Sequence, residues 1–491
     1  MFTKLPDEIQ KEIATYLDTK SLYFFARTSR RSLQNARELL RKHQEALLRS
    51  PTFTLLASGS ISLCYTSNAA YVCGRNDFGQ LGLSHTKKCT TLTPLPKLPG
   101  TLQQVVAGDY HTLVLTDQGL HACGRNDHGQ LGLGHTEDCT TLTLLPNLPG
   151  TLQQVMASFS HTLVLTDQGL YACGDNRFGQ LGLGHTKDCM TLTPLPKFPG
   201  TLQQVVTGGN HTLVLTDQGL YVWGRNYFGQ LGLGHTKDCT TLTPLPKLPG
   251  TIQQIVVGVF HTLVLTDQGL YACGRNEYGQ LGLGHTNPCT TLTPLPNLPG
   301  TIQQMVTGDN HTLVLTDQGL YACGLNDHGQ LGLGHTKNCT TLTPLPNLPG
   351  TIQQVVASGN HTLVLTDQGL YAWGRNEYGV LGRGHTENYT TLTPLPKLPG
   401  TLQQVVASGD HTLVLTDQGL YAWGCNYSGQ LGLTHTKNCT ALAPLENIPT
   451  ELRQLQALYR QLGKLITLSE TKGPLAQPDT LLSPSPDFTP K

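Results

Sequence analysis

The sequence predicts a mainly β fold, a β-propeller of seven or eight blades, each made of four antiparallel strands. The first observation is a repeat of 50 residues that begins at Thr101 and recurs through Thr401 without insertion or deletion, after a more divergent copy at 51–100. A strict period of this length indicates one supersecondary unit copied in tandem. The second observation is that four short strand-like runs fit into every copy, as in a propeller blade.

The strands expected in the second copy are rich in Val, Leu and Thr and are bounded by Gly or Pro; they are Leu102–Val106, Thr112–Thr116, Leu120–Cys123 and Thr141–Leu145. The middle two flank Asp117-Gln118-Gly119, where glycine can take the positive φ of a tight hairpin. The glycine-rich stretch 124–140 is expected to form a long ordered loop. Because each copy carries its own hairpin, a propeller fits better than a solenoid of parallel coils.

Composition excludes several classes of function. The formal net charge is zero, which gives no electrostatic argument for nucleic acid as a partner. No apolar run approaches the length of a membrane span, and the charged N-terminus lacks the core of a signal peptide. We therefore expect a soluble, cytoplasmic protein without a cofactor. The 14 cysteines mostly share two repeat positions and form no C-x-x-C pair, so we expect reduced thiols and no metal site.

Two histidines recur in the repeat, at the positions of His111 and His135. Rings of histidine suggest metal binding, but a residue that is identical in every blade is better explained as part of the scaffold. We expect each histidine to satisfy backbone groups within its own blade, and Asn126 and its copies to hydrogen-bond the glycine-rich loop.

Two segments of the repeat carry a resemblance to a known family. They read Gly108-Asp109-Tyr110-His111-Thr112 and Gly124-Arg125-Asn126-Asp127-His128-Gly129-Gln130-Leu131-Gly132. This pattern resembles the repeat of the regulator of chromosome condensation family, over about 400 residues. The family's Trp before Gly remains only as Trp223, Trp373 and Trp423. The resemblance implies a seven-bladed propeller, whereas the chain has eight copies, so either there are eight blades or the first copy is a cap.

Residues 1–50 have helical rather than strand periodicity, and three short helices are expected there. The sequence Leu5-Pro6-Asp7-Glu8-Ile9 and the apolar residues that follow it resemble an F-box, although Thr28 and Ser32 replace the usual Cys and Trp. The resemblance implies binding to the Skp-type adaptor of a cullin ubiquitin ligase through Leu5, Pro6, Ile9, Ile13, Leu17, Leu22 and Phe25. The alternative is a helical plug on the first blade.

After the propeller of 51–450, residues 451–468 are expected to form an amphipathic helix and 469–491 a disordered tail. Leu452, Leu455 and Leu458 begin the apolar stripe of this helix. We expect the helix to pack on the propeller, and the alternative is a helix that binds a partner.

The copies differ mainly in the turns between the first and second strands and in the loops between the third and fourth, which share one face of a propeller. Aromatic anchors among small polar residues are typical of protein-binding surfaces. The residues predicted to bind a target are Phe78, Asp109, Tyr110, His128, Phe159, Phe178, Asn210, Tyr227, Phe228, Phe260, Tyr278, Asp309, Asn310, Tyr378 and Tyr427.

The sequence therefore predicts a non-catalytic, substrate-recruiting subunit of a Skp–cullin–F-box ubiquitin ligase. The resemblance of the repeats implies an alternative, a nucleotide exchange factor for a Ran-like small GTPase, although the even spacing leaves no room for the wedge-like insertion used by that activity. A plain protein-binding scaffold is a third reading. An F-box joined to near-identical repeats also resembles effectors that bacteria inject into the host cytosol.

Overall fold

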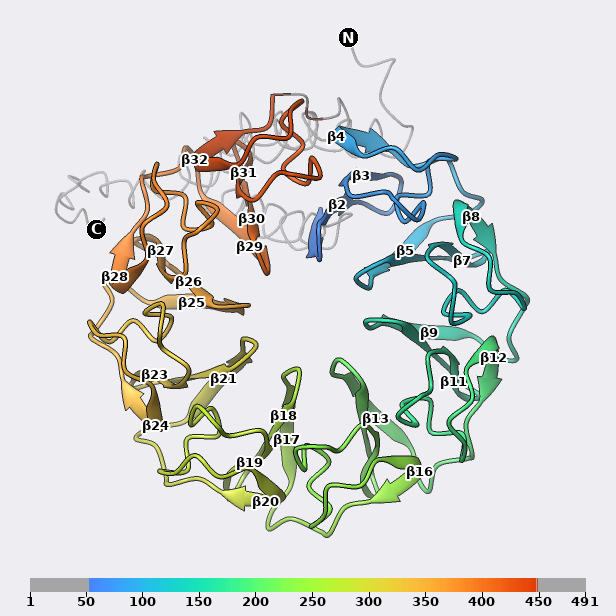
Figure 1. Ribbon diagram of the computed structural model, residues 1–491, viewed down its shortest axis with the longest axis horizontal. Coiled ribbons are helices and arrows are strands. Elements are labelled where there is room, and N and C mark those ends of the chain that lie inside the picture. Colours follow the sequence, from blue (N-terminus) through green and yellow to red (C-terminus); the bar gives the residue numbers. More distant parts are fainter. Residues whose placement is uncertain (1–52, 447, 449–491) are drawn as a thin grey trace, which may run out of the picture.

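The protein is an eight-bladed β-propeller. The computed structural model describes residues 53–446 and residue 448. Thirty-two strands form eight four-stranded antiparallel sheets in a ring, and in every sheet the strands follow chain order (Figure 1). The first copy is thus a blade and not a cap. The predicted F-box helices at 1–50, the predicted helix at 451–468 and the tail at 469–491 lie outside the described residues.

The strands occupy four radial positions in the ring. The innermost strands are β1 (Thr54–Ser58), β5 (Leu102–Ala107), β9 (Leu152–Ala157), β13 (Leu202–Thr207), β17 (Ile252–Val257), β21 (Ile302–Thr307), β25 (Ile352–Ser358) and β29 (Leu402–Ser408). The second strands are β2 (Ile61–Tyr65), β6 (His111–Thr116), β10 (His161–Thr166), β14 (His211–Thr216), β18 (His261–Thr266), β22 (His311–Thr316), β26 (His361–Thr366) and β30 (His411–Thr416).

The two outer positions complete each blade. The third strands are β3 (Ala70–Gly74), β7 (Gly119–Gly124), β11 (Gly169–Gly174), β15 (Gly219–Gly224), β19 (Gly269–Gly274), β23 (Gly319–Gly324), β27 (Gly369–Gly374) and β31 (Gly419–Gly424). The outermost strands are β4 (Cys89–Pro94), β8 (Cys139–Leu144), β12 (Cys189–Pro194), β16 (Cys239–Pro244), β20 (Cys289–Pro294), β24 (Cys339–Pro344), β28 (Tyr389–Pro394) and β32 (Cys439–Pro444).

All four predicted strands of the second blade are present, with shifts of one or two residues at their ends. The outermost strand begins earlier than predicted because Cys139 pairs with Gly124 after a shift in register. Within residues 53–446, no helix has the length and apolar character needed to cross a bilayer.

The hairpin between β6 and β7 confirms the expected tight turn. Gly119 has a φ of 136°, a region that favours glycine. The Thr116 hydroxyl accepts a hydrogen bond from the Gln118 amide at 3.2 Å, and Asp117 Oδ1 accepts one from the Thr101 amide at 2.9 Å. The second bond ties the hairpin to the link that enters the blade, which explains why both segments vary so little among the copies.

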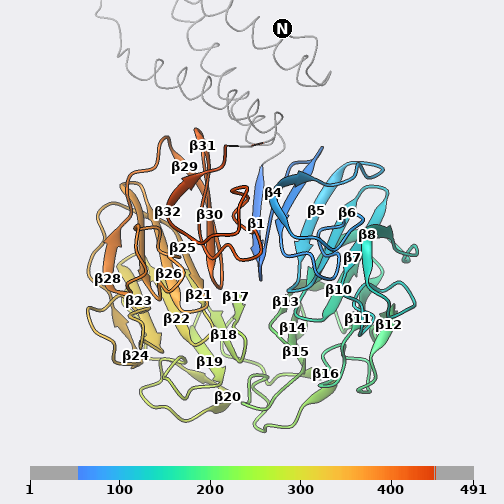
Figure 2. The same cartoon turned by 45° about the horizontal axis from the view of Figure 1, so that its top comes forward.

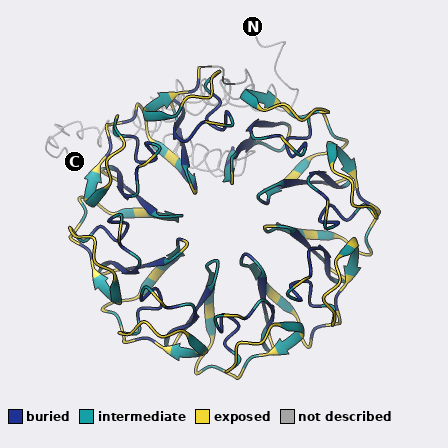
Figure 3. Ribbon diagram, in the orientation of Figure 1, coloured by how far each residue is buried: buried dark blue, intermediate teal, exposed yellow. Residues whose placement is uncertain are grey.

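The hydrophobic core lies between blades rather than within them. Leu113, Leu120 and Leu131 of the second blade pack against Val155 and Val164 of the third. The two middle strands of each blade are buried and the outermost strand is partly exposed (Figure 3). A single blade would leave this apolar surface in water, so the ring is needed to bury it.

The ring closes through the same kind of contact. The first and last blades lie side by side (Figures 1 and 2). Gln404 accepts a hydrogen bond from the Leu55 amide at 3.0 Å, and the Ser62 hydroxyl donates to the Gln430 carbonyl at 2.6 Å. Thr91 forms a β-bridge with Leu433, as Leu83 does with Thr141 at an internal junction. Among the strands of the described residues, every blade is built from its own repeat, without exchange of a strand between the first and last copies.

Candidate functional site

The glycine-rich loop after the third strand is held by a buried asparagine. Asn126 Nδ2 donates to the carbonyls of His135 at 2.8 Å and Glu137 at 3.1 Å, while its Oδ1 accepts from the Leu131 amide at 3.0 Å. The prediction for Asn126 is confirmed, and His135 is part of the same network within its own blade. This asparagine fixes the loop that carries the variable side chains.

The histidines at the position of His111 have a different role from the one predicted. His111 is fully buried, and its Nε2 lies 3.1 Å from the Thr162 hydroxyl of the next blade. His411 makes the matching contact across the closure, 2.9 Å from the Ser62 hydroxyl. His211, His261 and His311 make the same kind of contact with the next blade, whereas among the described residues His161 has no hydrogen-bond partner at either ring nitrogen and His361 has none at Nε2. The expectation that these side chains satisfy backbone groups in their own blade was wrong, because the partner that is found belongs to the neighbouring blade.

Predicted target-binding residues from consecutive blades meet on one face of the ring. The loop after β3 places Phe78 against Tyr110, which follows β5, with ring centroids 5.6 Å apart in an edge-to-face arrangement. Arg75 and Arg125 lie over both rings, at 5.2 to 5.7 Å from their centroids. We call the face that carries these turns and loops the loop face.

The largest aromatic cluster on the loop face spans the third, fourth and fifth blades. Arg225 lies 4.7 Å from the ring centroid of Phe178 and 5.5 Å from that of Phe260. Phe260 contacts Phe228 at 5.4 Å, and Arg275 lies 5.2 Å from Phe228. Cation–π and edge-to-face contacts of this kind restrict the rings before any partner binds. We call these five residues the arginine–aromatic ladder.

Further predicted aromatic residues extend this surface. Tyr227 contacts Phe228 edge to face at 4.9 Å and keeps 65% of its surface exposed. Tyr278 stacks on Arg275, and Tyr378 lies 5.9 Å from Tyr427, which is 58% exposed. These contacts place the predicted aromatics on the loop face in pairs and clusters rather than singly.

The polar residues predicted to bind a target are partly engaged within the protein. Asn310 Oδ1 accepts a hydrogen bond from Arg275 at 3.3 Å, and Asn210 Oδ1 accepts one from Gln180 at 3.5 Å. His128 is bonded to Asp188. These three side chains therefore hold neighbouring loops together and are weaker candidates for contact with a partner than the aromatic residues.

Asp109, Phe159 and Asp309 lie at the mouth of the central channel. Together with the glycine-rich ends of the innermost strands they line a cavity of about 330 Å³. Burial, with the charge of Asp309, raises the pKa of Asp109, and burial with the charge of Asp410 raises the pKa of Asp309. The mouth is therefore an acidic environment, and Phe159 at 38% exposure contributes its apolar side.

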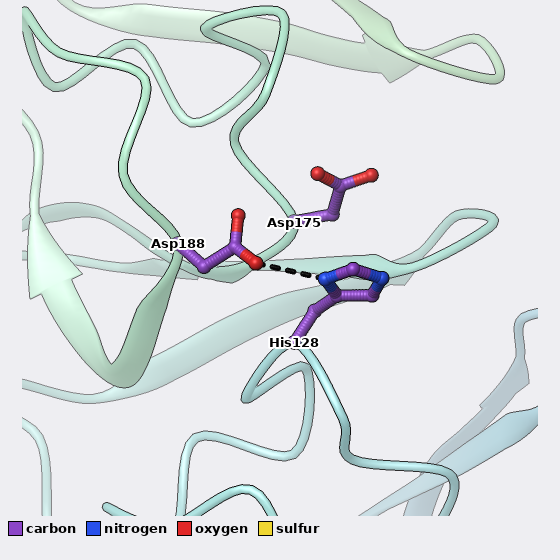
Figure 4. Close-up of side chains that lie close together, drawn as sticks. All are labelled: His128, Asp175 and Asp188. Atoms are coloured by element: carbon purple, nitrogen blue, oxygen red, sulfur yellow. Dashed lines mark hydrogen bonds and ion pairs between the residues drawn. The ribbon is translucent and has the colours of Figure 1, made fainter.

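One group of side chains has the composition of a metal site. His128, Asp175 and Asp188 place ligand atoms within 4.8 Å of one another at the junction of the second and third blades (Figure 4). These groups already have partners within the protein: His128 Nδ1 lies 2.8 Å from Asp188 Oδ2, and Asp175 accepts two hydrogen bonds from the Arg177 side chain and one from its backbone amide. Sequence reasoning missed this group because its members are neighbours only after adjacent blades pack.

The arginines of the loop face were also missed. An Arg-Asn pair recurs at 75, 125, 225, 275 and 375, directly before the residues predicted to bind a target. The recurrence of Arg was the available signal, but only the packing of neighbouring loops shows that these side chains stack between the aromatic rings.

Solved structures share this fold. Human WBSCR16 has a TM-score of 0.57 and 23% sequence identity, with 71% of this chain and 100% of that chain covered. Prp20p of Saccharomyces cerevisiae has a TM-score of 0.54 and 24% identity, covering 67% and 86%. The same yeast protein bound to Kap60 matches at a TM-score of 0.54 and 20% identity, covering 82% and 86%. None of the curated proteins matches the chain by sequence.

Family models match the repeats. The regulator of chromosome condensation (RCC1) repeat matches at 67–115, 117–165 and 167–215, and a second model of that repeat at 103–130 and 153–180. The RCC1-like domain matches residues 193–462, which is more than half of the chain. All these matches begin after residue 50, so the F-box resemblance of residues 1–50 stays a prediction. The chain belongs to the RCC1-like domain family.

Proposed function

We propose that this protein is a non-catalytic recruiting subunit of a Skp–cullin–F-box ubiquitin ligase, in which the loop face of the propeller binds the target protein. The observation that carries the binding role is the arginine–aromatic ladder with its exposed neighbour Tyr227. Residues of these types dominate the energetics of protein interfaces. Their stacking reduces the side-chain entropy lost on binding, which favours affinity.

The buried cysteines and histidines of the propeller are poorly suited to catalysis, as Cys123 and His111 illustrate. Burial raises the pKa of the Cys123 thiol and lowers the pKa of His111 to about 3, so that both groups are neutral near pH 7. A nucleophilic cysteine needs the opposite shift and access to a substrate. This supports a role in binding.

The ligase part of the proposal rests on residues 1–50 and is tested by pull-down with a purified Skp-type adaptor. The full chain is expected to retain the adaptor, and Leu5→Ala/Pro6→Ala to lose it. Gln44→Ala/Glu45→Ala, outside the F-box-like motif, is the control and should bind normally. If the unmodified chain does not retain the adaptor, the ligase assignment is wrong even if the propeller binds proteins.

The binding face is tested with paired variants on opposite faces of the ring. Proteins recovered by crosslinking to the full chain are compared with those recovered by Phe228→Ala/Phe260→Ala and by Gln218→Ala/Gln268→Ala. The first pair removes two rings of the ladder. The second pair changes exposed hairpin residues on the other face. Selective loss in the first pair supports the loop face, and equal loss or retention in both pairs contradicts it.

A second candidate is guanine-nucleotide exchange, favoured by membership of the RCC1-like domain family. The likeness to Prp20p, described with binding to Gsp1p and histones, adds support for the fold only. The test is the rate of labelled GDP release from a purified Ran-type GTPase. Acceleration by the full chain would favour exchange, and an unchanged rate would exclude it for that GTPase.

A further inference from the structure

The loop-face arginines differ in one respect that bears on what the face binds. In four blades the arginine forms an ion pair with an acidic residue two positions later in the same loop. These pairs are Arg75–Asp77 at 2.7 Å, Arg125–Asp127 at 2.5 Å, Arg275–Glu277 at 2.7 Å, and Arg375–Glu377. In the fourth blade the acidic position holds Tyr227, so Arg225 lacks this intramolecular counter-ion.

No other described residue replaces the missing carboxylate. Within the described part of the chain, the Arg225 side chain makes no ion pair and no hydrogen bond, and its contacts are with the rings of Phe178 and Phe260. These rings come from the blades on either side. A half-buried guanidinium keeps its hydrogen-bonding requirement, and its donors lie in its own plane, so stacked rings cannot satisfy them.

The surroundings of Arg225 are apolar and otherwise electrically balanced. Arg177 is held by Asp175, and Arg275 is held by Glu277 and Asn310. The exposed ring of Tyr227 and the partly buried Phe228 lie on the same loop. The centre of the arginine–aromatic ladder is therefore a single unneutralised cation beside an accessible aromatic surface.

We propose that Arg225 binds an anionic side chain of the target, adjacent to an apolar anchor that packs on Tyr227 and Phe228. The partner is thus an acidic peptide segment, with the anion supplied by a carboxylate or by a phosphorylated residue. Either group accepts paired hydrogen bonds from a guanidinium, and such bonds are the stronger kind. This inference rests on the proposed function and specifies the chemistry of the bound segment.

The probe is a set of fluorescein-labelled peptides with one fixed Leu-Phe anchor and a test residue placed in turn at each of the neighbouring positions. The test residue is Glu, phosphoserine, Gln or Lys. At the best position, Glu or phosphoserine peptides should bind the full chain about tenfold or more tightly than the Gln peptide, since bonds to charged groups are worth that much. Comparison of the Glu and phosphoserine peptides identifies the anion that fits better.

Two variants test whether Arg225 is responsible. Arg225→Gln removes the cation. Tyr227→Glu supplies the internal carboxylate seen at Arg275–Glu277, and because it also removes one ring of the anchor surface it is judged by the ratio of the Glu-peptide and Gln-peptide affinities and not by affinity alone. Both should remove the preference for anionic peptides. Arg125→Gln, at an arginine already paired with Asp127, is the matched control and should keep it.

Several outcomes would overturn the inference. The inference is wrong if no peptide with an anionic test residue binds at any position, if the Glu and Gln peptides bind equally well, or if the preference for anionic peptides survives both variants. Failure here is distinguishable from failure of the proposed function. If Phe228→Ala/Phe260→Ala abolishes crosslinking to targets while Arg225→Gln does not, the loop face binds proteins but Arg225 does not select an anion.

Discussion

The buried histidines make the stability of the propeller depend on pH. In the described part of the chain, seven blades place a fully buried histidine at the same junction. Burial lowers the pKa of His111, His211 and His311 to about 3 and that of His161, His261, His361 and His411 to about 4. Below pH 6.5 the unfolded chain therefore binds protons that the folded chain excludes.

The magnitude follows from the difference in pKa between the two states. An unfolded histidine titrates near pH 6.5, and one pKa unit corresponds to about 1.4 kcal/mol. At pH 5 each buried histidine thus costs about 2 kcal/mol, and seven cost about 14 kcal/mol. Because the folded-state pKa values all lie below 5, this loss is set by the unfolded value. It is comparable to the whole stability of an ordinary domain, about 5–15 kcal/mol.

The sign is opposite for the two acidic residues of the channel mouth and for Asp410, which lines a separate pocket with Arg375 and Glu377. The folded-state pKa values of Asp109, Asp309 and Asp410 are raised, so these groups bind protons more readily in the folded state and oppose acid unfolding. These three acidic residues act in this direction and retain access to solvent, whereas seven fully buried histidines act in the other direction, so the histidines dominate. The combined effect of these ten residues is a loss of stability as the pH falls from 6.5, which levels off near pH 3 to 4.

The assay is urea unfolding at pH 8, 7, 6 and 5.5, followed by the fluorescence of the three buried tryptophans. At pH 5.5 the slope of the unfolding free energy against pH should correspond to about six protons. His311→Asn should reduce this slope by the equivalent of about one proton, whatever the effect of the substitution on the free energy of unfolding itself. If the free energy of unfolding changes by less than about 2 kcal/mol between pH 7 and 5.5, the conclusion that the seven histidines are buried and neutral in the folded protein is wrong.

Three further predictions concern stability and access. Gly174→Ala should lower the free energy of unfolding in urea by at least about 2 kcal/mol more than Gly169→Ala does. Both glycines have positive φ, but a Cβ at Gly174 would lie 2.5 Å from the Ser160 carbonyl oxygen, whereas a Cβ at Gly169 would meet open space. Equal losses for the two variants would contradict the predicted clash. Trp223→Cys should lower the free energy of unfolding by about 3 kcal/mol through the cavity it leaves, although several other blades have Cys at this position. A loss near zero would show that the neighbouring side chains repack to fill the cavity. Under native conditions a thiol reagent should modify the seven partly exposed cysteines and spare the seven buried ones. Mass spectrometry of the intact protein counts the modified cysteines. Early modification of all 14 would contradict the prediction and show that the blades open.

The architecture was largely predictable because the same strand pattern occurs in all eight copies of the repeat. A single copy leaves the strand ends uncertain by one or two residues, as at Cys139, since the pairing with Gly124 depends on a register shift that no local pattern marks. The number of blades could not be derived. It depends on the angle between neighbouring sheets, which is set by the packing of Leu113 and its copies against the next blade.

The candidate site was predictable in position but not in arrangement. The variable aromatics identified the loop face, because an otherwise constant repeat makes their variation visible. The chemistry of that face depends on contacts between residues far apart in sequence, such as Arg225 with Phe178. The role of His111 was mistaken for the same reason: its partner, Thr162, belongs to the following copy.

The way the ring closes bears on how such a chain can evolve. The surfaces that join the last blade to the first are of the kind found at internal junctions, as the bonds from Leu55 to Gln404 and from Val155 to Gln104 show. Within residues 53–446, no blade takes a strand from another copy of the repeat. Recombination between neighbouring copies of the gene segment would therefore yield a shorter or longer chain whose end surfaces still match, and its ring would close once the angle between neighbouring sheets adjusted to the new number of blades. One genetic event could then widen or narrow the arc over which the variable loops are displayed, while each remaining blade keeps its own strands and pairing surfaces.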